Sequence, residues 1–139
     1  GGKLLMNFTT LIEEFCDANS APEDAQFIDI LRAYKDEWLN LSMKIGESAM
    51  ANPDEAGAAA VDYLMYSGYI TLAYFWARTA VLARTRLAAS PADSEFYEAK
   101  LMTARFYFDR LLPRTLSHKQ LMLSGAENLM QMPEAMFDL

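Results

Sequence analysis

Residues 63–77 read YLMYSGYITLAYFWA, and this run of 15 residues without a charge decides the expected fold. Its apolar side chains recur at intervals of three and four rather than two, which predicts a helix and not a strand. A helix that spans a bilayer needs about 20 apolar residues, and Asp62 and Arg78 bound this run closely. We therefore expect a helix buried within a folded protein and no transmembrane segment.

This helix is too apolar to be covered on one side only. A bundle helix needs an apolar stripe over about three of every seven positions, yet Asp62 is the only charged residue between Gly57 and Ala77. Because its aromatic side chains point in several directions, more than one side must be covered. The sequence thus predicts that a second copy or a neighbouring domain covers a face formed by Tyr66, Tyr69, Tyr74 and Trp76. Alternatively, the tyrosine hydroxyls reach water and no partner is needed.

The rest of the chain also shows helical periodicity. Interior glycines are costly in helices, so we interpret Gly68 as a point where another helix passes close, with a slight bend as the alternative. Ser20 and Glu23 have the spacing of a capping box, and Pro113 lies inside a helix that it should kink. We expect long helices over residues 3–18, 20–50, 52–89 and 93–123.

Short connections between consecutive helices favour antiparallel neighbours. The predicted fold is therefore all-α: an antiparallel up-down-up-down four-helix bundle with a short C-terminal helix ending near Met130. The tail after Pro133 contains Met136 and Phe137, which should pack somewhere. Residues 1–139 are expected to form a single domain, which is an ordinary length for one.

Composition limits the possible functions. A hydrophobic content of 53% excludes a disordered chain. With one cysteine, Cys16, no intrachain disulfide can form, and we expect a cytoplasmic protein. The net charge of −7 argues against nucleic acid as the main partner. Residues 1–77 carry a net −8 and residues 78–119 a net +4, so the basic segment could meet an acidic surface or an anion, or be paired within the bundle.

Residues for catalysis or metal binding are few. A di-iron bundle needs two Glu-x-x-His pairs, whereas His118 is the only histidine and Thr115 precedes it by three. We expect Cys16 to be a small buried hydrophobe, His118 to lie on a helix surface or cap, and Asp62 and Asp109 to bond arginine or tyrosine. The sequence thus predicts no catalytic, cofactor-binding or metal-binding residue.

The basic segment offers one candidate contact set. Arg110, Arg114 and His118 are spaced by four, so they share a helix face that could hold a phosphate or a carboxylate. The alternative is that they pair with acids of a neighbouring helix or subunit. We predict possible anion or partner contacts at Arg105, Arg110 and Arg114.

Three segments resemble one protein family. Residues 96–113 read FYEAKLMTARFYFDRLLP, residues 125–137 read GAENLMQMPEAMF, and residues 63–80 read YLMYSGYITLAYFWARTA. Together they resemble the C-terminal helical extension of longer bacterial acyl-CoA dehydrogenases, including the methylmercaptopropionyl-CoA dehydrogenase type. The resemblance covers about residues 52–137.

The resemblance implies a fragment of a larger cytoplasmic flavoprotein of fatty acid metabolism. The parent enzyme would use FAD to remove hydrogen across the α,β bond of an acyl-CoA thioester, and its catalytic glutamate and main flavin contacts would precede this chain. The implied partners are the rest of the dehydrogenase and a second subunit in a homo-oligomer. The fragment would contribute docking, dimerisation and shielding of the active site. A free-standing helical interaction module and a small ligand-binding bundle are the alternatives.

Overall fold

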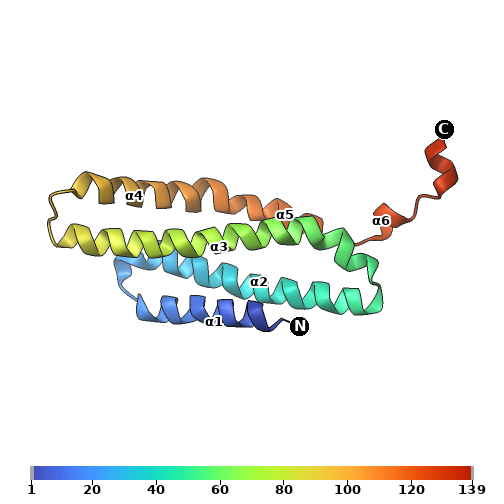
Figure 1. Cartoon of the computed structure of the whole chain (residues 1–139), viewed down its shortest axis with the longest axis horizontal. Coiled ribbons are helices and arrows are strands. Elements are labelled where there is room, and N and C mark those ends of the chain that lie inside the picture. The colour runs from blue at the N-terminus through green and yellow to red at the C-terminus, as the bar shows by residue number, and fades with distance from the viewer. Residues whose placement is uncertain (1, 139) are drawn as a thin grey trace.

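A computed structural model of the protein describes residues 2–138, and every regular element in that range is helical (Figure 1). The prediction of an all-α protein is therefore confirmed. The bounds of the four longest helices lie within about two residues of the predicted ones, except that α2 begins five residues later than predicted and the fourth helix is interrupted. The elements are α1 (Lys3–Ala18), a 3-10 turn (Pro22–Asp24), α2 (Ala25–Ala51), α3 (Asp54–Ala88), α4 (Ser94–Phe106), a π turn (Tyr107–Leu111), a 3-10 turn (Leu112–Arg114), α5 (Thr115–Met122), α6 (Glu127–Met130) and a final 3-10 turn (Glu134–Asp138).

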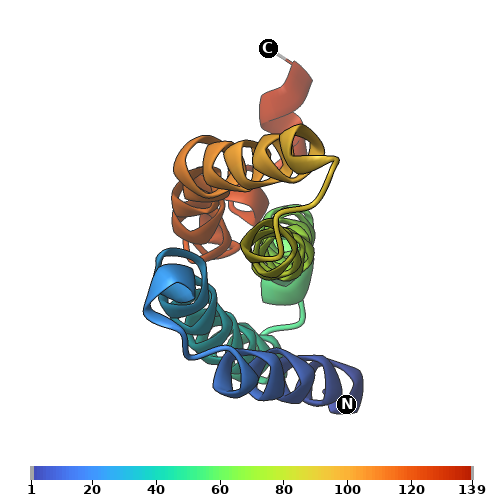
Figure 2. The ribbon, with the colours of Figure 1, turned by 90° about the vertical axis from the view of Figure 1, so that its left-hand side faces the viewer.

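The helices do not form the closed square of a four-helix bundle. Helices α2 and α3 pack together at the centre, with α1 on one side and α4–α5 on the other (Figures 1 and 2). Phe8 of α1 meets Tyr74 of α3 edge to face, at 5.5 Å between ring centroids. Phe27 of α2 meets Phe108 of the π turn in the same way at 5.2 Å. The up-down order of the helices is as expected, but α1 and α4 lie on opposite sides of the central pair.

The core lies where the central pair meets its neighbours. Its fully buried side chains include Leu31 of α2 and Tyr66 and Ile70 of α3. Ala73, Ala77 and Ala80 continue the buried side of α3. Such small side chains allow neighbouring helices to approach closely at interior packing density. The covered side of α3 is therefore set by its alanines as much as by its large apolar residues.

The chain breaks its helix ahead of Pro113. The α-helical pattern stops at Phe106, and the π turn and the 3-10 turn follow before α5 begins. Proline lacks an amide hydrogen and clashes with the preceding turn, so a regular α-helix cannot pass through it. The π turn also orients Tyr107, whose hydroxyl donates to the backbone carbonyl of Tyr69 at 2.6 Å. The predicted kink is thus confirmed, and it serves to join α4 and α5 to α3.

Two local predictions are wrong, and a third is untested. Ser20 and Glu23 do not form a capping box; a 3-10 turn precedes α2, and no side chain caps it. Nothing in the described chain lies within 4 Å of the position that a Cβ would take at Gly68, so no helix of this chain passes it closely. The predicted close helix stays untested, because only a partner outside this chain could supply it. Met136 and Phe137 of the tail are exposed instead of packed.

Candidate docking surface

Helix α3 exposes an apolar stripe along its length. At about 3.6 residues per turn, positions separated by alternating steps of three and four lie on one side of a helix. The residues at this spacing are exposed and apolar except for the half-buried Thr79; we call the exposed ones the α3 stripe: Gly57, Val61, Leu64, Gly68, Leu72, Phe75 and Leu82. The exposed fractions of the five large side chains are 72% for Val61, 71% for Leu64, 51% for Leu72, 51% for Phe75 and 54% for Leu82.

The stripe is uncovered because the neighbouring helices lie on the other sides of α3. The buried residues Tyr66, Ile70 and Ala77 occupy the opposite side of the helix, where α2 and α4–α5 pack. Figure 2 shows α3 nearly end on, with no other helix on one of its flanks. Contiguous exposed apolar surface of this kind marks sites of protein interaction. The excess of apolar residues in α3 is therefore exposed as one continuous surface, the α3 stripe.

The predicted interaction face and the α3 stripe are different sets of residues. Tyr66 is fully buried, and its hydroxyl donates to Glu37 at 2.6 Å. Tyr74 is also buried, between the rings of Phe8 and Phe15. These two tyrosines therefore cannot form an exposed face. Tyr69 and Trp76 are half-buried against the core and do not belong to the α3 stripe.

The reason for this difference lies in the helix period. The predicted face was defined by its large aromatic side chains. Steps of three and four from Gly68 instead define a side that contains Leu64, Leu72 and Phe75. A sequence search for the side of α3 that holds its glycines would have found the stripe. The alanines Ala73, Ala77 and Ala80 share the other side of the helix, and they would have indicated the side that neighbouring helices cover.

The predicted basic contacts lie elsewhere. Arg105, Arg110 and Arg114 are exposed on α4 and the two turns after it. None of the acids within residues 2–138 forms an ion pair with them. The turns change the helix period between Arg110 and His118, and His118 instead bonds Asp62 through Nδ1 at 2.9 Å. Asp62 was expected to bond arginine or tyrosine, so that prediction is wrong, and Asp109 is exposed.

Cys16 has no features of a nucleophile. Its side chain is buried, and burial raises the pKa of the thiol to about 11. Only thiolates attack efficiently, so this cysteine is inert at neutral pH. The prediction of a small buried hydrophobe is confirmed.

One protein family matches most of the chain. A family described as acetyl-CoA dehydrogenase C-terminal like matches residues 8–133. The chain belongs to this family. The match runs from α1 through α6 and includes the α3 stripe and the segment FYEAKLMTARFYFDRLLP. Comparison with curated proteins found no match. The resemblance seen in the sequence is thus confirmed for the family, and the methylmercaptopropionyl-CoA dehydrogenase type remains a prediction.

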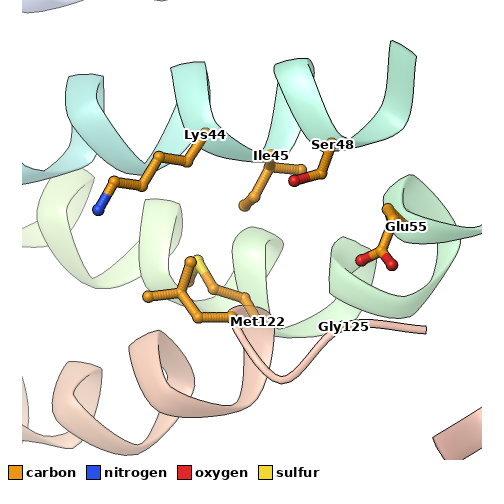
Figure 3. A pocket seen from close by; sticks show the side chains of 7 residues that line it. Lys44, Ile45, Ser48, Glu55, Met122 and Gly125 are labelled. Carbon is orange, nitrogen blue, oxygen red and sulfur yellow. The ribbon is translucent and has the colours of Figure 1, made fainter. Parts of the chain in front are cut away.

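The pockets of this member of the acetyl-CoA dehydrogenase C-terminal-like family differ widely in size. One small pocket lies between α2, the start of α3 and the chain after α5, with Lys44, Ser48, Glu55 and Met122 among its lining residues (Figure 3). Its cavity volume is about 60 Å³. Two larger pockets, of about 580 and 520 Å³, are open grooves along α3; Phe75 and Leu82 line the first, and Leu64 lines the second. Glu55 is already bonded, because its Oε1 accepts from the amide of Ala126 at 3.2 Å. The pocket beside Glu55 is therefore too small for FAD, since pockets for drug-sized ligands measure about 300–1,000 Å³.

Two other features, a metal-binding cluster and a membrane-spanning helix, are absent from the described part of the chain. Within residues 2–138, no group of three His, Cys, Asp or Glu side chains is placed to hold a metal ion. In the same range, no helix combines the length and apolar character needed to cross a membrane. The α3 stripe remains the strongest candidate for function.

Proposed function

We propose that this chain is an assembly module of a larger FAD-dependent acyl-CoA dehydrogenase and docks through the α3 stripe. One observation carries the proposal: a member of this family leaves a helix of 35 residues uncovered along a side lined by large apolar residues. Such surface is costly to leave in water, at about 25 cal/mol per Å². Contact with the enzyme would remove that cost.

In this proposal the chain supplies no chemistry. The parent enzyme would remove hydrogen across the α,β bond of an acyl-CoA thioester, with FAD held by parts of the protein outside these residues. The bundle would stabilise the assembled enzyme, link subunits and help to shield the acyl-CoA site. Because Cys16 is buried and Asp62 is bonded to His118, neither is free to act on a substrate.

The test is a pair of matched substitutions in the complete dehydrogenase that contains this chain. Leu64→Glu places a charge on the stripe, where Leu64 is 71% exposed, and Met43→Glu places one on α2, where Met43 is 59% exposed. We expect Leu64→Glu to lower the temperature at which the enzyme loses its flavin, and Met43→Glu to leave it unchanged. Equal behaviour of the two variants, or native purification without any flavoprotein, would contradict the proposal.

A further inference from the structure

The side of α3 that carries the stripe is complementary to itself when it is reversed about the height of residue 70. Gly68 and Leu72 lie two positions on either side of that residue, Val61 and Thr79 nine, and Asp54 and Arg86 sixteen. Two copies placed antiparallel about a two-fold axis bring each residue beside the one equally distant on the other side. We infer that the partner of the α3 stripe is the α3 stripe of a second copy, packed antiparallel with the two-fold axis at the height of residue 70 along the helix.

Shape supports this pairing. In the antiparallel register, Leu72 of one copy faces Gly68 of the other, and Leu82 lies next to Gly57. Both glycines have open space where a Cβ would be, with nothing of their own chain within 4 Å. The stripe therefore alternates large side chains with gaps that can receive them, as helix packing requires. Leu64 and Phe75 lie on the same edge of the stripe and meet each other across the axis.

Charge supports the antiparallel direction. Asp54 at the start of α3 and Arg86 near its end are both exposed, and neither forms an ion pair within residues 2–138. They are 32 residues apart, or about 48 Å along the helix axis. The antiparallel pair places each Asp54 opposite an Arg86, whereas a parallel pair would oppose like charges at both ends.

This inference rests on the proposed function, because it uses the same surface. It names a second copy of the chain as the partner, and not the catalytic part of the enzyme. Self-complementarity is the reason: a surface selected for an unrelated domain has no need of matching residues on either side of its own midpoint. The other occupant, the catalytic part, becomes an outcome of the experiment.

The experiment measures the dimerisation of the 139-residue chain by sedimentation over a range of concentrations. The wild-type chain should dimerise. Gly68→Arg should abolish the dimer, and Gly46→Arg should not, because Gly46 is an equally open helical glycine on α2. Asp54→Arg and Arg86→Asp should each raise the Kd of the dimer about tenfold at low salt. The double variant should return the Kd to the wild-type value. Circular dichroism checks that each variant folds, and Leu64→Glu gives a second test if Gly68→Arg does not.

Three results would overturn the inference: a wild-type chain that stays monomeric, a dimer that survives Gly68→Arg, or a charge reversal that fails to restore affinity. Suppose the isolated chain is monomeric and Gly68→Arg releases the bundle from the catalytic part of the full enzyme. The proposed function then stands, and the second copy is the wrong partner. If Gly68→Arg affects neither assembly, both proposals fail.

Discussion

The bidentate ion pair of Asp24 and Arg84 fastens the start of α2 to the end of α3. Asp24 is 2% exposed, and its two carboxylate oxygens accept from Nε and a terminal nitrogen of Arg84, both at 2.6 Å. A buried carboxylate is tolerated only when it is paired and hydrogen-bonded. The same bond raises the pKa of the Arg84 guanidinium further above its ordinary value. This pair takes the place of the helix cap that Ser20 and Glu23 were expected to provide.

Removing the partner of this carboxylate should be costly. We expect Arg84→Ala to lower the free energy of unfolding by about 3 kcal/mol, because Asp24 would remain buried and unpaired. Chemical denaturation measures the change. Arg105→Ala is the matched control, since Arg105 is exposed, and it should change stability by less than about 0.5 kcal/mol. A loss below 1 kcal/mol for Arg84→Ala would show that water reaches the carboxylate.

At the scale of helices, Glu37 joins three of them. On α2, it accepts from the hydroxyl of Tyr66 on α3 at 2.6 Å and from Nζ of Lys119 on α5 at 2.5 Å. Burial alone would raise the pKa of Glu37, but the hydrogen bonds from Lys119 and Tyr66 outweigh it and hold this pKa below the ordinary value of 4.5. Burial, together with the bond to Glu37, raises the pKa of Tyr66. The hydroxyl therefore remains a donor.

The lowered pKa of Glu37 gives stability a pH dependence of known sign. Because folding favours the carboxylate, its contribution is complete above about pH 4.5 and is lost as the pH falls through the lower folded-state pKa. We expect Glu37→Gln to cost about 1–2 kcal/mol at pH 7 and to flatten the decline of stability below pH 4.5. Denaturation at a series of pH values measures both effects. Glu47→Gln, an exposed position on the same helix, should leave the profile unchanged.

At the scale of the whole molecule, the C-terminal segment is separate from the helical body. Figure 1 shows α6 and the residues after it directed away from the other helices. More than half of the surface is exposed for each of its large apolar side chains: Leu129, Met130, Met132, Met136 and Phe137. The last residue held by the body is Ala126, which is buried and bonded to Glu55.

Ending the chain after Ala126 should therefore leave the body intact. We expect the free energy of unfolding to change by less than about 0.5 kcal/mol, because the removed side chains contribute little burial. Thermal and chemical denaturation of the shortened protein test this. Ending the chain after Leu123 instead should destabilise it, since Ala126 and its bond to Glu55 are lost. A large effect of the first truncation would mean that residues 127–138 pack on the body in solution.

Helix content and helix bounds could be predicted from local sequence. The three-and-four spacing in α3 and the break at Pro113 each depend on residues close together in the sequence, so the sequence alone specifies them. The interaction face could not be predicted in the same way. Whether Tyr66 or Leu64 faces water depends on where α2 and α5 lie, and those positions follow from contacts between residues far apart in sequence.

The sequence by itself determined an all-helical protein of this dehydrogenase-related family, whose third helix has more apolar surface than one covered side requires. Only the tertiary structure decided which side stays bare. Periodicity defines the sides of a helix, but the packing of Tyr66, Ile70 and Ala77 against neighbouring helices selects the side that is buried. The remaining side, from Gly57 to Leu82, is left to the solvent or to a partner.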